Sequence, residues 1–566
     1  MCSSSVPSGS GASSGAESDA LVAPVLGANP FVGLTLGQVA NAGGRWAGAV
    51  VRRPSVLLGS LLNWAAQEVR VLSGVSNVTP EPKDRRFADP AWNHPLWWRV
   101  VQTYLVTRDS VLSSVDQLGL DRKSADRARF ALMQLTEATA PSNNLFTNPV
   151  ALGTALDTRG RSLYHGARHY LHDLRVNGGM PSQVDTRPFR VGDTVANTPG
   201  AVVYRTPMFE LIQYRPTTPK VLARPTMIIP PQVNRFYFLD LAPGRSFIEY
   251  ALGRGIQMFL ISWRNPRPRH SAWGLDDYAA SCLEAIRVTT EISKSENVNI
   301  AGFCAGGMTT SAVLSHLADT DEALVNAATL AVTMIDSQVH STLNMFASER
   351  TLHSSVDRSR QKGVLDGETL AKVFAFVRPN DLVWNYVVSN YLLGKNPPAF
   401  DVLAWNKDTT NLPAALHEAF MNLWIDNALV NPGTLKVLGT PVDLNKVRND
   451  LYVAGALTDH LVPWEAAYAA KHAFGGNVRF VLSNSGHVQA LINPPGNPKS
   501  NYYLNHADAE DARDWLRGAT RHTGTWWKDW ADWTIEHSGE ARAKPRSLGN
   551  RRHRILAEAP GRYVRE

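Results

Sequence analysis

Three segments of the chain carry a side chain suited to acyl transfer directly after an apolar stretch. The first is Asn299–Gly307 (NIAGFCAGG), where a strand pattern passes through Cys304 into a segment compatible with a helix. Glycines at 302 and 306 flank the cysteine as in a nucleophile elbow, because a Cβ at either position would clash where strand and helix meet. The helix N-terminus would favour a thiolate and offer the backbone N–H of Ala305 to an oxyanion. Alone, this pattern also fits the glycine-rich turns of non-catalytic α/β proteins.

The other two segments supply an acid and a base. The apolar pattern at 451–456 is followed by a loop with Asp459, and the one at 478–482 by a loop with His487. The order nucleophile, acid, histidine is typical of the α/β-hydrolase fold, and each residue follows a predicted strand, where open parallel sheets form their sites. Taken singly, Asp459 also fits a turn and His487 a surface loop, but all three in this order favour a catalytic set. We expect the adjacent His460 to be structural or supporting.

The elements that must position these residues alternate between strand and helix from Gly200 onwards, which predicts a mostly parallel sheet with crossover helices. The alternation lapses where this fold accepts a cap insertion. The expected organisation is a flexible tail at 1–28, a mostly helical N-terminal domain at 29–196, an α/β-hydrolase catalytic domain at 200–540 with the cap insertion at about 336–443, and a basic C-terminal tail at 541–566. Tryptophans within 508–537 predict a helix packed on the sheet: Trp515, Trp526, Trp527, Trp530 and Trp533.

Longer sequence words carry a resemblance to a known family. They occur in the family's order at 230–237 (PPQVNRFY), 262–266 (SWRNP), 302–307 (GFCAGG), 378–386 (RPNDLVWNY), 459–464 (DHLVPW) and 559–564 (APGRYV). With these words the chain resembles the polyhydroxyalkanoate synthases of class I and class II over most of its length. The word at 177–184 (NGGMPSQV) is more similar to the medium-chain branch and the word at 302–304 to the short-chain branch, so the monomer length stays open.

The resemblance implies a poly(3-hydroxyalkanoate) polymerase, an acyltransferase that joins (R)-3-hydroxyacyl-CoA units into polyester and releases CoA through a thioester on Cys304. His487 would deprotonate Cys304 and then the attacking 3-hydroxyl, and Asp459 would orient His487 or help to activate that hydroxyl. The Ala305 N–H, with a donor from the loop at 231–234, would hold the oxyanion. A homodimer at polyester granules is also implied, without a cofactor, since CoA enters with the substrate. Two alternatives stay open: a thioesterase or depolymerase of the same fold, and a non-catalytic granule-surface protein.

Composition indicates a globular cytoplasmic enzyme. The 566 residues are 44% hydrophobic and 19% charged, and the three cysteines are too few for a disulfide framework. We expect no transmembrane segment, because no apolar run approaches the roughly 18 residues that a span requires. The net charge of +7 comes partly from the C-terminal arginines and lysine, which we interpret as solvated cations rather than a nucleic-acid site. No metal-ligand or dinucleotide motif accompanies them.

Overall fold

The computed structural model describes residues 48, 53–82, 84–339, 349–507 and 509–566, so the predicted tail at 1–28 lies outside the described residues. The described chain forms two compact units. A helical unit contains the described part of Met1–Asp185 together with Lys372–Ala399, and a sheet unit contains that of Thr186–Ala371 and Phe400–Glu566. A stretch inside the predicted cap insertion therefore belongs to the helical unit.

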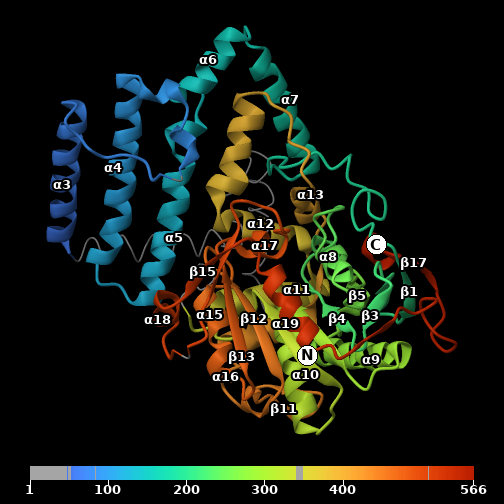
Figure 1. Ribbon diagram of the computed structural model, residues 1–566. Helices are drawn as coiled ribbons and strands as arrows, with labels where there is room; N and C mark the ends of the chain where they lie inside the picture. Colours follow the sequence, from blue (N-terminus) through green and yellow to red (C-terminus); the bar gives the residue numbers. More distant parts are fainter. Residues whose placement is uncertain (1–47, 49–52, 83, 340–348, 508) are drawn as a thin grey trace, which may run out of the picture. The chain divides into compact units, whose positions relative to one another are not determined.

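The helical unit is built mainly from helices (Figure 1). Asp121 and Asn148 begin two of these helices by accepting the N–H groups of Ser124 at 3.0 Å and Ala151 at 3.1 Å, which would otherwise lack partners. In the segment before α4 (Pro95–Gln117), Phe87 and Trp92 belong to the core of this unit, and their rings meet edge to face. The helices are α3 (Pro54–Leu72), α4 (Pro95–Gln117), α5 (Arg122–Ala138), α6 (Pro149–Asp157) and α7 (Arg161–Val176), with the end of α12 (Gly367–Val377) and the π-helical turns Asn380–Trp384 and Val387–Leu392.

The sheet unit contains an 11-stranded sheet in the order β15-β14-β13-β12-β7-β6-β4-β5-β2-β1-β17. Its central strands, from β5 to β13, run parallel, and the outer strands are antiparallel. The strands are β1 (Gly200–Arg205), β2 (Phe209–Tyr214), β4 (Thr226–Ile229), β5 (Met258–Trp263), β6 (Val298–Phe303), β7 (Val325–Ala331), β12 (Asp450–Ala456), β13 (Val478–Ser483), β14 (Asn501–Leu504), β15 (Thr520–Thr523) and β17 (Ala557–Glu558). Short two-stranded pairings join β3 (Lys220–Leu222) to β16 (Ala541–Ala543), β8 (Val364–Leu365) to β9 (Leu412–Pro413) and β10 (Lys436–Val437) to β11 (Thr440–Pro441).

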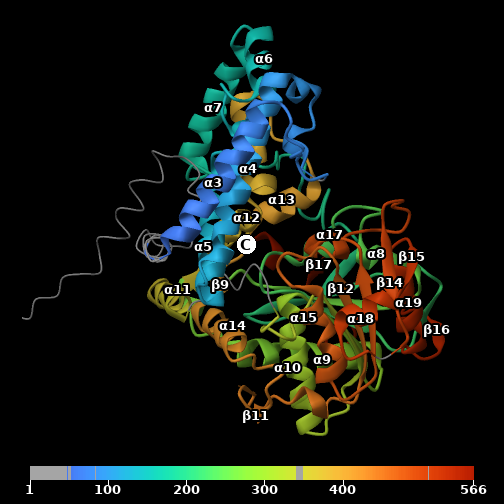
Figure 2. The ribbon, with the colours of Figure 1, turned by 90° about the vertical axis from the view of Figure 1, so that its left-hand side faces the viewer.

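Helices cover both faces of the sheet, as parallel sheets require (Figure 2). Successive side chains of a strand point to opposite faces, so Met227 and Ile229 of β4 share a hydrophobic cluster with α9 and α10, whereas Ile228 shares one with α8 and α19. The helices of this unit are α8 (Phe247–Gly253), α9 (Leu275–Ser293), α10 (Ala305–Asp319), α11 (Glu349–Lys362), the first residues of α12, α13 (Asp401–Lys407), α14 (Ala414–Ile425), α15 (Trp464–Tyr468), α16 (Ala470–Ala473), α17 (His487–Leu491), α18 (Ala512–Arg517) and α19 (Trp527–Glu536). The architecture confirms the predicted α/β-hydrolase arrangement of a mixed sheet with crossover helices.

Two C-terminal expectations differ from the structure. The tryptophan-rich stretch forms α18, β15 and α19 rather than one helix, and Trp515 packs on the face of α9 while Trp530 packs on the opposite face. The segment predicted as a basic tail at 541–566 folds into the sheet unit through β16 and β17, with Tyr563 and Val564 buried. Hydrophobic burial of these side chains outweighs the repulsion among its cations, most of which remain exposed.

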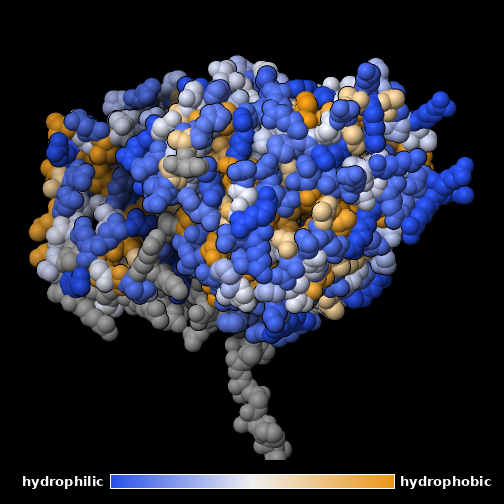
Figure 3. Space-filling view, turned by 60° about the horizontal axis from the view of Figure 1, so that its bottom comes forward, coloured by the Kyte–Doolittle hydropathy of each residue, from blue (hydrophilic) through white to orange (hydrophobic). Residues whose placement is uncertain are grey.

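None of the described helices is both long and apolar enough to cross a bilayer. On the face shown in Figure 3, hydrophobic side chains are scattered among hydrophilic ones.

Candidate active site

The nucleophile elbow lies where β6 ends at Phe303 and α10 begins at Ala305. Between them Cys304 has φ +52° and ψ −122°, a conformation that costs a side-chain-bearing residue free energy and is typical of functional turns. Its N–H donates to the carbonyl of Ala331 at 2.9 Å, and its own carbonyl accepts from the N–H of Gly307 at 2.9 Å. Both bonds fix the turn, and the cysteine is half-buried.

The glycines of the elbow permit this close packing. A Cβ on Gly302 would lie 2.7 Å from the Cα of Gly307, and one on Gly306 would lie 2.3 Å from the carbonyl oxygen of Ile229. The predicted clash at both positions is confirmed. A Cβ on Gly307 would meet the side chain of Thr333 as well, so α10 starts against the ends of both neighbouring strands.

Asp459 and His487 follow adjacent parallel strands. The pairing of Ala456 with Ser483 ends β12 and β13 at the same edge of the sheet, and the two loops begin there. The Nδ1 atom of His487 lies 2.7 Å from Oδ2 of Asp459, and both side chains are almost completely buried. The other carboxylate oxygen accepts the N–H groups of Leu461 at 2.8 Å and Val462 at 2.9 Å, so the acid is held from both sides.

Cys304 completes the series, because its side chain lies close enough to His487 to act on the pKa of the imidazole. With Nδ1 bound to Asp459, Nε2 is the imidazole nitrogen left for the sulfur. Burial alone would lower the pKa of His487, but the charges of Asp459 and Cys304 outweigh it and raise the pKa well above 6.5. The structure therefore brings all three predicted residues together. His460 lies in the same loop as Asp459, and its supporting role stays a prediction.

The loop after β4 lies beside the start of α10. Gly306 packs against the carbonyls of Ile229 and Pro230, which brings the loop at 231–234 close to Ala305, the first residue of α10. Nε2 of Gln232 donates to Oγ1 of Thr309 at 3.0 Å and ties the loop to the helix. Neither Gln232 nor Thr309 is among the site residues predicted from the sequence. Gln232 falls within one of the family words, whereas nothing in the local sequence marks Thr309.

Among the described residues, no group of three histidine, cysteine or acidic side chains is arranged to hold a metal ion. Cys282 lies in α9 and is fully buried, as expected for a core thiol. At the candidate site, the thiol of Cys304, the imidazole of His487, the carboxylate of Asp459 and backbone N–H groups lie together.

The strand order, the elbow and the Asp–His pair define the α/β-hydrolase fold, and the family model described as the alpha/beta hydrolase fold matches residues 243–494. A second model, for the poly-beta-hydroxybutyrate polymerase (PhaC) N-terminus, matches residues 83–251. The chain is 42% identical to poly(3-hydroxyalkanoate) polymerase 1 of Ectopseudomonas oleovorans, over 96% of this chain and 97% of that one. Poly(3-hydroxyalkanoate) polymerase 2 of the same organism is 44% identical over 91% and 92%.

A third relative, the poly(3-hydroxyalkanoate) polymerase subunit PhaC of Cupriavidus necator, is 40% identical over 87% of this chain and 85% of that one. The chain therefore belongs to the poly(3-hydroxyalkanoate) polymerase family, and it is an enzyme. The resemblance read from its sequence words is confirmed. Among solved structures, the monoacylglycerol lipase of Paleococcus ferrophilus matches 56% of this chain and 98% of its own at 11% identity and a TM-score of 0.32, a likeness too distant to bear on function.

Proposed function

We propose that the protein polymerises (R)-3-hydroxyacyl-CoA into a poly(3-hydroxyalkanoate) and releases CoA at each addition through a thioester on Cys304. The observation that carries the proposal is the series of interacting side chains from Cys304 through His487 to Asp459, with sulfur rather than oxygen at the elbow. The names of the relatives support polyester as the product. The types of residue at the site support a reaction through a thioester on Cys304.

In the first half-reaction His487 accepts the proton of the Cys304 thiol, and the sulfur attacks the carbonyl carbon of the CoA thioester. The raised pKa of His487 suits this step, since it favours the imidazolium that forms when His487 takes up the proton. The tetrahedral intermediate then breaks its bond to the CoA sulfur, and His487 returns the proton to that sulfur. One thioester replaces another, so the acyl group stays activated on the enzyme.

In the second half-reaction the 3-hydroxyl of another hydroxyacyl unit attacks the acyl carbon held by Cys304. His487 accepts the hydroxyl proton and passes it to the departing sulfur of Cys304. The product is an oxoester, which is lower in free energy than the thioester, so growth of the chain runs downhill. A serine at the elbow would form an oxoester already in the first step and lose this driving force.

The developing oxyanion would be held by backbone N–H groups. The N–H of Ala305 lies in the first turn of α10, where amides have no acceptor within their own helix, and the helix dipole adds partial positive charge. A second donor would come from the loop at 231–234, which Gln232 and Thr309 hold beside the helix. Removing one preorganised donor from such a site slows the reaction by about 10²–10³-fold.

The test supplies (R)-3-hydroxyacyl-CoA to the purified protein and measures free thiol and insoluble polyester together. The wild-type protein should produce both, and Cys304→Ala should lower both by on the order of 10⁴-fold or more and lose covalent labelling by substrate. Cys282→Ala is the matched control, because that thiol is buried away from solvent and should leave both products unchanged. Polymer made by Cys304→Ala would refute the assignment. Thiol without polymer would identify a hydrolase, and neither product would identify a granule-surface protein.

We also propose that the enzyme works as a homodimer at the surface of cytoplasmic polyester granules and needs no cofactor, as the family resemblance implies. Light scattering of the active fraction should give the mass of a dimer, and a fluorescent fusion should collect at granules. Prolonged dialysis against a chelator should leave the rate of CoA release unchanged. A monomeric active fraction would contradict the homodimer, and a diffuse fusion would contradict the association with granules. Loss of CoA release after dialysis would contradict the absence of a cofactor.

A further inference from the structure

The last described residues of the chain pack against the outermost strands on one side of the 11-stranded sheet. β17 pairs with β1 through Ala201 and Glu558, and the chain then continues to Glu566. Tyr563 and Val564 are each 1% exposed. Although the sequence predicts a solvated tail here, these two side chains are as deeply buried as those of the core.

A buried carboxylate fixes this segment to the hairpin of β1 and β2. Glu210, which is 0% exposed, accepts the backbone N–H groups of Arg562 at 2.9 Å and Tyr563 at 3.0 Å, and its charge pairs with Arg205 at 2.6 Å. The hydroxyl of Tyr563 donates to the carbonyl of Thr206 at 2.6 Å. Charge-assisted bonds of this kind are the strong ones, so the segment is firmly held on this side.

The opposite side of the segment contacts the loop that follows β4. Arg235, 7% exposed, donates from Nη1 to the carbonyl of Tyr563 at 3.1 Å and from Nη2 to the backbone oxygen of Glu566 at 2.9 Å. Its Nε lies 3.2 Å from Oδ1 of Asp408, which supplies the counter-charge. The planar guanidinium holds its donors in a rigid fork, so these contacts fix the direction of the loop and not only its distance.

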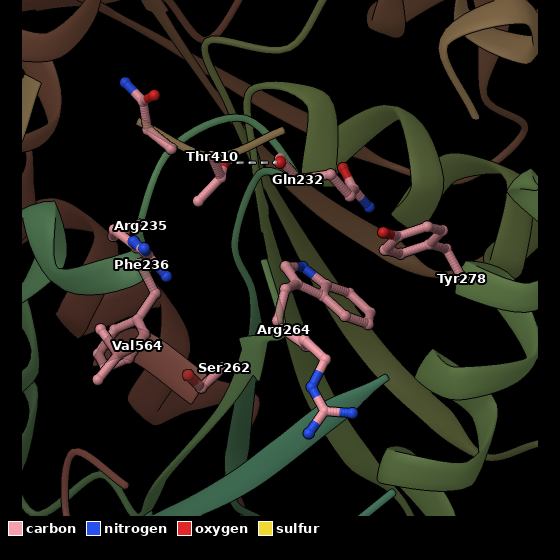
Figure 4. A pocket seen from close by; sticks show the side chains of 10 residues that line it. Gln232, Arg235, Phe236, Ser262, Arg264, Tyr278, Thr410 and Val564 are labelled. Carbon is pink, nitrogen blue, oxygen red and sulfur yellow. Dashed lines mark hydrogen bonds between the residues drawn. The ribbon is translucent and has the colours of Figure 1, made fainter. Parts of the chain in front are cut away.

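A second arginine extends the contact to the end of β5. Nε of Arg264 lies 3.0 Å from Oε2 of Glu566, and its guanidinium carbon lies 4.0 Å from the centre of the Tyr563 ring. Figure 4 shows Val564 beside Arg235 and Phe236, with Arg264 further along the same pocket and Thr410 bonded to the carbonyl of Gln232.

We propose that Tyr563 and Glu566 form a brace that holds the loop at 231–235 in place as an oxyanion donor, with Arg235 as the positioning residue through which the brace acts. The inference deepens the proposed function and rests on it. Gln232 and Thr309 attach the loop to α10 on one side, and the brace attaches it to the β1–β2 hairpin on the other. Loss of the brace leaves the loop free to shift against α10, and misplacement on the order of 1 Å can cost about 10²-fold in rate.

The experiment compares two reactions of the same sulfur in Arg235→Gln. Acylation by a 3-hydroxyacyl-CoA needs an oxyanion site, whereas alkylation of Cys304 by iodoacetamide forms no oxyanion. Single-turnover release of CoA should fall about 10- to 100-fold, while alkylation of Cys304, followed by peptide mass spectrometry, should keep the wild-type rate. Arg235→Lys, which keeps the charge beside Asp408 and one donor, should recover part of the acylation rate.

Arg565→Ala is the matched control, because this exposed neighbour bonds the carbonyl of Gly561 within the segment and should leave both rates unchanged. If Arg235→Gln does not fold, Glu566→Ala tests the brace from its other end, because it releases the segment from Arg264 while Arg235 keeps its two backbone acceptors. Acylation should then fall by a smaller factor than that predicted for Arg235→Gln, and alkylation should not fall. Unchanged acylation, or acylation and alkylation falling together, would overturn the brace. CoA release by Cys304→Ala would instead overturn the proposed function, a separate result.

Discussion

Replacing Gly306 with alanine tests the contact that sets α10 against the loop after β4. The added Cβ would lie 2.3 Å from the carbonyl oxygen of Ile229 and 2.6 Å from that of Pro230. Both oxygens belong to the backbone at the end of β4, so neither can swing aside as the tip of a side chain could. The start of α10 and the end of β4 must therefore move apart.

The size of the effect follows from this distance. To widen the distance between the new Cβ and the carbonyl oxygen of Ile229 from 2.3 Å to about 3.0 Å, α10 and the end of β4 must separate by about 0.7 Å. Overpacking of this kind lowers the free energy of unfolding by about 1–3 kcal/mol. Gly306 directly follows Ala305, whose N–H is a proposed oxyanion donor. Since a misplacement on the order of 1 Å can cost about 10²-fold, we expect CoA release to slow by about 10- to 100-fold.

Urea unfolding gives the change in stability, and single-turnover release of CoA gives the change in rate. Gly253→Ala is the matched control, because a Cβ there meets nothing within 4 Å and alanine favours the helix α8 by up to about 1 kcal/mol. This control should keep the wild-type rate. A Gly306→Ala protein with the stability and rate of the wild type would show that the close approach does not set up the elbow.

Three further predictions concern titration, reactivity and folding. Asp459→Asn should lower the pKa of His487, because burial disfavours the imidazolium and the substitution removes the negative charge that stabilises it. NMR titration of His487 measures this shift, and an unchanged pKa would contradict the prediction. The raised pKa of His487 stabilises the folded state fully below about pH 6.5 and ceases to do so as the pH rises through the folded value, so the stability lost in Asp459→Asn should shrink at alkaline pH. Iodoacetamide should label Cys304 in the native protein and spare Cys282, because burial raises the pKa of that thiol; equal labelling by mass spectrometry would be the opposing result. Glu210→Gln should lose about 1–3 kcal/mol in urea unfolding and speed hydrogen exchange of the two N–H groups that Glu210 accepts, and unaltered exchange would argue against this anchor.

Much of the fold could be predicted because its signals are local. Glycines at 302 and 306 around Cys304 encode a turn that only small residues allow, and apolar runs between helical stretches encode a parallel sheet. The confirmed α/β-hydrolase architecture follows from these patterns. Long sequence words, rather than composition, gave the family. The tryptophans of the C-terminal region predict one helix, whereas the structure has α18, β15 and α19 there, because apolar content does not tell which face of the sheet each residue meets.

By itself the sequence determined the elbow, the order of Cys304, Asp459 and His487 along the chain, and the strand that precedes each of them. Only the tertiary structure decided that Asp459 and His487 meet at 2.7 Å, that residues 372–399 join the helical unit, and that Glu566 contacts Arg235. Periodicity and turn chemistry act between near neighbours in the chain. Contacts between residues hundreds of positions apart depend instead on which buried donors and charges find partners when the whole chain packs.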